Sequence, residues 1–313
     1  MTSLAARSRT ADLALLMMAA AWGSSYLATK TVATTENSFG FLALRFLIAT
    51  AALAVVMAPR LRALRRDEVL FGMAFGCILA VIFSLETFGV VQTTASNAGL
   101  IIALTIVITP LLSGDAPPPM FYAAAALAVV GIAFLTHAGG PARLNTGDLL
   151  IIAAAFARAV HVVTIDRACR TRPMDTGRLT LVQLATSLVV FTTLAQFNGG
   201  GLIATAATMG THDWLLTVYL ALVCTVFAFV VQIWAVRRTS ATRVSLLLGF
   251  EPFFAAAFGT CVSAQPITVM TAIGAALVLA GTSWGRGIDN RATAARSEQL
   301  APTDEMPVAI VAP

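Results

Sequence analysis

The residues best able to do chemistry in this sequence are ionisable side chains that lie inside long apolar segments. Glu251 lies near the middle of one such segment, directly before Pro252, and Arg45 and Glu86 lie in two others. At the centre of a membrane helix a charged side chain costs about 2.5–3.5 kcal/mol on insertion scales, so each one requires a partner or a water-filled cavity. These residues are therefore the first candidates for a binding site.

Glu251 and Pro252 together suggest a broken helix. Proline lacks a backbone donor and leaves a carbonyl oxygen free one turn earlier, so a break there could present backbone groups to a ligand. Alternatively, Glu251 is structural and pairs with Arg45 or another buried cation. Both interpretations stay open and both could hold.

Two further sets of polar residues could line a pathway. Glu86 and Gln232 place hydrogen-bonding side chains 146 residues apart, although simple interhelical hydrogen bonds, worth about 0.6 kcal/mol on average, would also account for them. Arg158 and His161 are three residues apart and share a helix face. Arg158 could accept an anionic group and His161 could titrate near neutral pH, or the two could form a satisfied structural pair.

An aromatic stripe precedes these residues in the chain. Trp22, Tyr26 and Lys30 recur every four residues and so share one face of a helix. They could line a pathway with a cation near its outer mouth. They could equally be packing residues, with the Lys30 ammonium extended toward water.

Signatures of enzymes and metal sites are missing from the sequence or fail on context. Residues 281–285 match G-x-S-x-G, but no strand is expected before them and the last histidine, His212, lies upstream. The sequence contains neither a Walker A motif nor H-E-x-x-H, and its four cysteines stand singly. We therefore expect no catalytic residue, no cofactor and no metal, and a protein that is not an enzyme.

The composition indicates which elements must position these side chains. Of the 313 residues, 58% are hydrophobic and 11% are charged, against roughly a quarter charged in soluble domains. About ten windows of ~20 mostly apolar residues match the thickness of a bilayer. They are residues 12–34, 38–59, 68–90, 95–113, 119–138, 147–168, 178–197, 213–236, 243–263 and 268–287. An all-α integral membrane protein follows, with no room for a nucleic-acid-binding domain.

The arginines predict the orientation of these spans. With the N-terminus inside, sixteen of the twenty basic residues fall in cytoplasmic segments and two fall outside, so both ends are expected in the cytoplasm. A single lysine among the basic residues is typical of a GC-rich bacterial genome. With the spans and their orientation, this predicts a multi-pass protein of the inner cell membrane of a bacterium. Residues 1–11 are expected to form a cytoplasmic tail, and residues 288–313 a disordered one.

An internal repeat relates the two halves of the chain. When 146 is added to the residue numbers, Thr94-Ala95-Ser96 aligns with Ser240-Ala241-Thr242 and Glu86 aligns with Gln232. Two five-span halves, residues 12–143 and 144–287, are the simplest explanation. Because five is odd, the second half enters the membrane from the opposite side, which gives an inverted repeat.

Several motifs carry a resemblance to a known family. They are Trp22-Gly23-Ser24-Ser25, Leu44-Arg45-Phe46, Thr93-Thr94-Ala95-Ser96-Asn97-Ala98, Gln232-x-Trp234-Ala235-x-Arg237-Arg238-x-Ser240-Ala241-Thr242-Arg243 and Leu248-x-x-Glu251-Pro252-x-Phe254-Ala255-Ala256. Over about residues 12–287 the chain resembles the EamA family of the drug/metabolite transporter superfamily. The resemblance implies ten helices in two inverted five-helix repeats, and movement of metabolites or drug-like compounds, often outward. In the fourth span Ile106 replaces the usual proline, so we expect the helix break at Pro110, one turn later.

These features predict a secondary transporter, an exporter in which a small-molecule substrate moves by alternating access through a midplane cavity. Its substrate-pathway candidates are Trp22, Tyr26, Arg45, Glu86, Arg158, His161, Gln232, Trp234 and Glu251. Its partners would be the lipid bilayer and protons as the coupling ion. A passive facilitator or channel also fits the sequence, and a membrane-embedded enzyme or receptor fits less well. The sequence specifies neither the substrate nor the oligomeric state.

Overall fold

The computed structural model describes residues 2–93, 95–114, 118–136, 145–197, 201–263 and 269–299, and the regular elements in these ranges are all helices. The N-terminal half forms α1 (Thr2–Val32), α2 (Ser38–Met57), the 3-10 helix η1 (Ala58–Ala63), α3 (Arg66–Gln92), α4 (Ala95–Ile102), α5 (Thr105–Ser113) and α6 (Pro119–Thr136). The C-terminal half forms α7 (Thr146–Thr171), α8 (Thr176–Phe197), α9 (Gly201–Thr208), α10 (Thr211–Ala221), η3 (Leu222–Phe227), α11 (Ala228–Val236), α12 (Ala241–Leu248), α13 (Glu251–Ser263) and α14 (Val269–Gln299).

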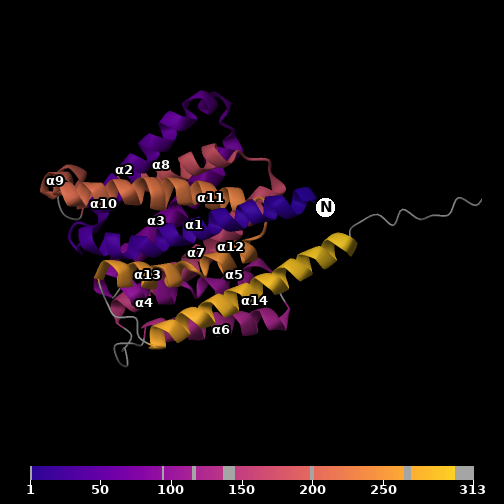
Figure 1. Ribbon diagram of the computed structural model, residues 1–313. Coiled ribbons are helices and arrows are strands. Elements are labelled where there is room, and N and C mark those ends of the chain that lie inside the picture. The colour runs from indigo at the N-terminus through magenta and orange to yellow at the C-terminus, as the bar shows by residue number, and fades with distance from the viewer. Residues whose placement is uncertain are drawn as a thin grey trace, which may run out of the picture.

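Six helices among the described residues are long and apolar enough to cross a membrane. They are Arg9–Val32, Ser38–Ala63, Arg66–Gln92, Thr146–Thr171, Thr176–Phe197 and Thr211–Val236. The long helices run alongside one another as a bundle (Figure 1), and many of their large apolar side chains are exposed on its outside. Without water in a bilayer, the backbone groups of a helix are satisfied within the helix, which is why such segments are helical. The protein is a helical, multi-pass membrane protein.

Two ends of the chain differ from the prediction. Helix α1 begins at Thr2, so residues 2–11 are part of a helix rather than a separate tail. Helix α14 continues to Gln299, so the prediction of disorder from Ile288 is wrong as far as that residue, and residues 300–313 lie outside the described part. Alanine, arginine, glutamate and glutamine are strong helix formers, and they carry α14 beyond its apolar part.

Two apolar segments are interrupted helices. One breaks between α4 and α5 at residues 103–104, and the other between α12 and α13 at residues 249–250, which is the same 146-residue offset that relates the two sequence halves. At both breaks backbone amides reach three residues back, as from Leu104 to Ile101 (3.0 Å) and from Phe250 to Leu247 (3.2 Å). The second break directly precedes Glu251.

The two prolines relate differently to these breaks. Pro252 is the second residue of α13, where its missing N–H removes no intrahelical bond. Pro110 lies inside α5, which continues through it, so the prediction of a break at Pro110 is wrong. The break lies instead at residues 103–104, before Ile106, the sequence equivalent of Pro252.

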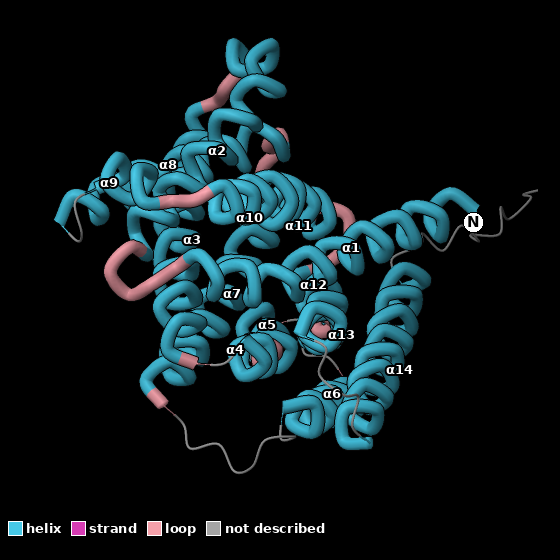
Figure 2. Tube along the Cα trace, turned by 60° about the vertical axis from the view of Figure 1, so that its left-hand side comes forward, coloured by secondary structure: helices cyan, strands magenta, loops and turns pink. Residues whose placement is uncertain are grey.

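The packing of the helices determines where side chains meet. Helix α1 lies against α12 and α13, and α7 lies correspondingly against α4 and α5. Helix α3 contacts α7 and α8, and α2 contacts α8 and η3. Helices α6 and α14 lie side by side at one edge of the bundle (Figures 1 and 2). Side chains of α1, α2, α3, α7 and α11 line the space between these helices.

A π-helical turn, η3, interrupts the segment from Thr211 to Val236. Its Thr225 hydroxyl donates to the carbonyl oxygen of Leu220, five residues back, at 2.9 Å. A π turn leaves a local irregularity in the backbone ladder and is frequent at functional sites. In this turn the carbonyl oxygen of Cys224 accepts a hydrogen bond from Nε1 of Trp22, and the hydroxyl of Thr225 accepts one from Nε of Arg45.

Candidate functional site

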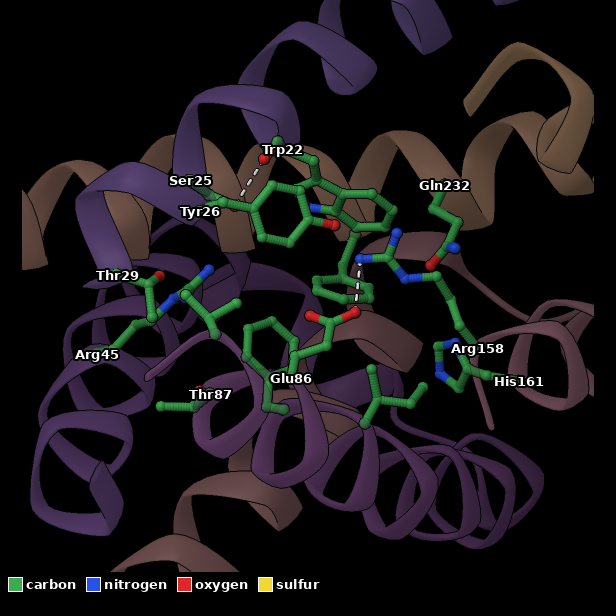
Figure 3. A pocket seen from close by; sticks show the side chains of 14 residues that line it. Trp22, Ser25, Tyr26, Thr29, Arg45, Glu86, Thr87, Arg158, His161 and Gln232 are labelled. Atoms are coloured by element: carbon green, nitrogen blue, oxygen red, sulfur yellow. Dashed lines mark hydrogen bonds and ion pairs between the residues drawn. The ribbon is translucent and has the colours of Figure 1, made fainter. Parts of the chain in front are cut away.

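A pocket lies in this space and is lined by side chains from α1, α2, α3, α7 and α11 (Figure 3). Its lining residues are Trp22, Ser25, Tyr26, Thr29, Arg45, Ile82, Phe83, Glu86, Thr87, Val90, Arg158, His161, Phe229 and Gln232. Seven of the nine pathway candidates from the sequence are therefore in the lining. Of the other two, Glu251 contacts lining residues directly, and Trp234 stacks beneath Arg238, whose guanidinium carbon lies 4.4 Å from the ring centroid.

Arg158 is the centre of the charge network. Its Nη1 lies 2.9 Å from Oε2 of Glu251, and its Nη2 lies 2.7 Å from Oε1 of Glu86. The guanidinium carbon stands 4.3 Å above the centroid of the Trp22 ring, and the Tyr26 hydroxyl donates to Oε1 of Glu251. One cation is thus shared by two carboxylates and held by an aromatic face.

The three charged side chains differ in how far they open to the pocket. The side chain of Glu251 is 2% exposed and that of Arg158 is 8% exposed, whereas that of Glu86 is 13% exposed. Glu251 accepts hydrogen bonds from both Arg158 and Tyr26, while Oε1 of Glu86 has an ion pair but no hydrogen bond of good geometry. Glu86 is therefore the more exposed of the two carboxylates that Arg158 contacts.

The expected pair between Arg45 and Glu251 is not formed, and that hypothesis is wrong. Arg45 is 3% exposed, its Nε donates to the Thr225 hydroxyl at 2.9 Å, and its guanidinium carbon lies 4.7 Å from the Phe83 ring centroid. The reason is the packing of α2 against the π-helical turn, which supplies a neutral partner. The cation that reaches Glu251 comes from α7 instead.

Two neutral polar side chains complete the lining. Gln232 is fully buried, and neither its amide nitrogen nor its amide oxygen has a hydrogen-bond partner. His161 is also fully buried, with Nε2 3.1 Å from Oε1 of Gln183 and its ring edge-on to Phe75 and Phe229. Buried polar atoms in proteins are normally paired, so the amide of Gln232 is an exception among the lining side chains, with hydrogen-bonding groups that the described residues leave unused.

Hydrogen bonds fix the position of Trp22 and Lys30 on α1. The indole Nε1 of Trp22 donates to the carbonyl oxygen of Cys224 at 2.9 Å, so the π-helical turn orients the ring beneath Arg158. The Lys30 ammonium donates to the carbonyl oxygens of Val90 and Thr93, at the end of α3. Trp22 is therefore part of the site, whereas Lys30 joins helix ends.

The sequence profile of the EamA-like transporter family matches residues 9–137 and residues 145–284. The chain belongs to the EamA-like transporter family. An uncharacterized transporter of Archaeoglobus fulgidus is 26% identical over 273 residues, which cover 86% of this chain and 83% of that protein. A probable terminal-alkyne amino-acid exporter of Streptantibioticus cattleyicolor is 27% identical over 286 residues, or 86% of this chain and 90% of that protein.

A solved structure described as a crystal structure of protein shares this fold. Its TM-score is 0.73 at 19% sequence identity, and the alignment covers 91% of this chain and 99% of the other. At this identity the likeness concerns the fold alone. The family and its transporter relatives point to a transporter rather than an enzyme.

The described part of this EamA-like transporter holds no group of three His, Cys, Asp or Glu side chains that could bind a metal ion. The chemistry available in the pocket is instead ion pairing and hydrogen bonding. The side chains that carry it are Arg45, Arg158, Glu86 and Gln232, and the Trp22 face already holds the guanidinium of Arg158.

Several residues of the site and its borders escaped the sequence analysis. Thr225 and Cys224 have no motif, because a π-helical turn leaves no hydropathy signal. Asp12 binds Arg243 near one end of the bundle, and Asp148 accepts a hydrogen bond from Thr93 at the other. Asp12 lies in the N-terminal part of α1 and Asp148 in the first turn of α7, and the 146-residue offset does not relate the two.

Proposed function

We propose that this member of the EamA-like family is a secondary transporter that exports small metabolites. The observation that carries the proposal is the pocket itself, in which Arg158, Glu86 and Glu251 form a buried charge network beside the unpartnered amide of Gln232. Buried ionisable groups in a membrane bundle are costly and mark substrate or ion pathways. No described group suggests a covalent reaction there.

We further propose ten spans in two inverted five-helix repeats, divided as residues 12–143 and 144–287. Six would be the long helices, two the interrupted pairs α4–α5 and α12–α13, and two the helices α6 and α14. The 146-residue spacing of the breaks supports this arrangement, as does the match of the family profile to two stretches. Interrupted helices at matching positions of two halves are a feature of transporters that alternate access around a fixed site.

Both ends of the chain would lie in the cytoplasm, with the protein in the inner cell membrane of a bacterium. The distribution of arginines supports this orientation. In a cysteine-free background, a membrane-impermeant thiol reagent should label Gly210→Cys but not Arg170→Cys in intact cells. If only Arg170→Cys were labelled, the protein would have the opposite orientation in the membrane.

Protons are the proposed coupling ion, since the sequence has no nucleotide-binding motif and Glu86 and Glu251 can each bind a proton. Metabolites that accumulate in cells lacking the protein, and are lost when it is overproduced, would identify a substrate. Purified protein in liposomes should then move that substrate against its gradient when a pH gradient is imposed, and Glu251→Gln should abolish this accumulation more fully than downhill exchange. Movement that ignores both pH and voltage and stops at equilibrium would identify a passive facilitator instead.

A further inference from the structure

We propose that residues 58–66, between α2 and α3, form a docking surface for the headgroups of anionic phospholipids. These residues comprise η1, Leu64, Arg65 and the first residue of α3, and we call them the basic segment. The basic segment has no residue in the pocket lining, so this role is separate from whatever compound the pocket transports. The exposure, the charge and the position of the segment each support the role.

The basic segment is exposed over its whole length. All nine residues are accessible, and Leu61 and Leu64 are 37% and 38% exposed. Just before the segment, Val55 and Val56 are 77% and 66% exposed, near the end of a helix long and apolar enough to cross a membrane. The segment joins this helix to the next candidate span, and arginines are costly in hydrocarbon, so it lies at the membrane surface. Its leucines are therefore placed to enter the boundary between headgroups and acyl chains.

Four arginines give the basic segment a high positive charge. Nη1 of Arg65 donates to the carbonyl oxygen of Pro173 at 3.2 Å. Within the described residues, the side chains of Arg60, Arg62 and Arg66 form no hydrogen bond and no ion pair. A guanidinium is a planar fork of donors that matches a phosphate group. Three such forks are thus available to groups outside the protein.

The two carboxylates that follow the arginines do not compensate this charge. Oδ1 of Asp67 lies 2.6 Å from Nη1 of Arg172. Glu68 is fully buried and accepts two hydrogen bonds from Arg178, both at 2.7 Å. Both acids are therefore paired with arginines near the beginning of α8, and the positive charge of the basic segment stays uncompensated.

The position of the basic segment suits a membrane surface. In Figure 1 the dark violet segment that follows α2 forms the top of the view, to one side of α1, α10 and α11, and it also forms the top of Figure 2. Segments that combine basic and apolar residues lie in the plane of the interface, where anionic headgroups attract them. An anionic phospholipid offers a phosphate to the arginines and acyl chains to the leucines, whereas free phosphate would leave the leucines in water.

Quenching of a fluorophore on the basic segment measures which lipids surround it. The full-length protein, with its native cysteines replaced by alanine and Ala63→Cys labelled with bimane, is placed in phosphatidylcholine vesicles. These contain a small, equal fraction of phosphatidylglycerol or phosphatidylcholine with a spin label near the top of one acyl chain. We expect phosphatidylglycerol to be enriched about threefold or more at the fluorophore, because unpaired arginines attract its charge. Sodium chloride should weaken the enrichment, because it screens exposed charges.

Two results would overturn the proposal. Equal quenching by the two lipids would show that the basic segment has no preference for an anionic headgroup, and would leave it to an acidic protein or to no partner. An enrichment that inorganic phosphate removes, while sodium chloride of the same ionic strength does not, would identify a site for free phosphate instead.

Variants assign the enrichment to the arginines. Replacing all three unpaired arginines together, as Arg60→Gln, Arg62→Gln and Arg66→Gln, should abolish it, while the matching lysine variant keeps the charge and should retain most of it. Because these side chains lose no described contact, the unfolding temperature of the glutamine variant should stay unchanged. Arg291→Gln, at an exposed site in α14, is the matched control and should leave the quenching unchanged. An enrichment that survives in the glutamine variant would refute the assignment.

Discussion

Arg243 binds the carboxylate of Asp12 through two hydrogen bonds, from Nε to Oδ1 at 3.0 Å and from Nη2 to Oδ2 at 2.9 Å. The pair joins the N-terminal part of α1, about three turns after its start, to the beginning of α12. At the opposite end of α1, the hydroxyl of Thr93 donates to Oδ1 of Asp148 at 2.5 Å and joins the end of α3 to the beginning of α7. The two aspartate contacts thus join helices near opposite ends of α1.

Removing either aspartate charge should open one end of the bundle selectively. A charge-assisted hydrogen bond contributes about 1.5–3 kcal/mol. Asp12→Asn should therefore increase, by about tenfold or more, the fraction of molecules whose pocket is open toward the N-terminal end of α1. Asp148→Asn should do the same at the other end. The measurement is the rate at which an impermeant thiol reagent labels Ser25→Cys, a pocket position, from each side of a proteoliposome.

Asp213→Asn is the matched control for this prediction. Asp213 is only partly buried, and it caps the start of α10 through the Gly210 amide at 3.0 Å, away from both aspartate contacts, so its neutralisation should change neither rate. If Asp12→Asn and Asp148→Asn raised labelling from the same side, the two contacts would not close opposite ends.

Neutralising Arg158 should destabilise the protein more than neutralising all three members of its network. Arg158→Met leaves two carboxylates without a cation, and breaking a buried ion pair costs about 3–5 kcal/mol. Adding Glu86→Gln and Glu251→Gln to that variant should recover part of the loss, because the uncompensated charges are then gone. Thermal unfolding in detergent measures both effects, and additive losses across the set would contradict the coupling.

How much of this site the sequence could predict depends on the kind of information needed. The apolar spans were predictable because hydropathy marks them. The buried ionisable residues were predictable because charged side chains are rare inside such spans. The contact partners of these ionisable residues were not predictable from the sequence. The sequence suggests a pair between Arg45 and Glu251. In the structure Arg45 contacts Thr225 and Arg158 contacts Glu251, because the packing of α2 and α7 determines which side chains meet.

The helix irregularities show the same limit. Pro110 predicted a break that α5 does not have, since proline marks a weakened helix but neighbouring helices decide where the chain bends. At the second break Gly249 permits a close contact, because a Cβ there would overlap Cδ1 of Ile106. Such contacts between distant segments leave no local signal in one sequence.

Gly23 holds α1 close to the second helix break, and replacing it should disturb the site. A Cβ at this position would lie 2.7 Å from the carbonyl oxygen of Glu251 and 2.8 Å from the amide nitrogen of Ala255. Because backbone atoms cannot rotate away, Gly23→Ala should cost about 1–3 kcal/mol of stability and weaken ligand binding, as Trp22 and Tyr26 shift. Gly287→Ala, with open space around it, should lower neither the unfolding temperature nor the affinity. Equal behaviour of the two variants would show that α1 tolerates displacement.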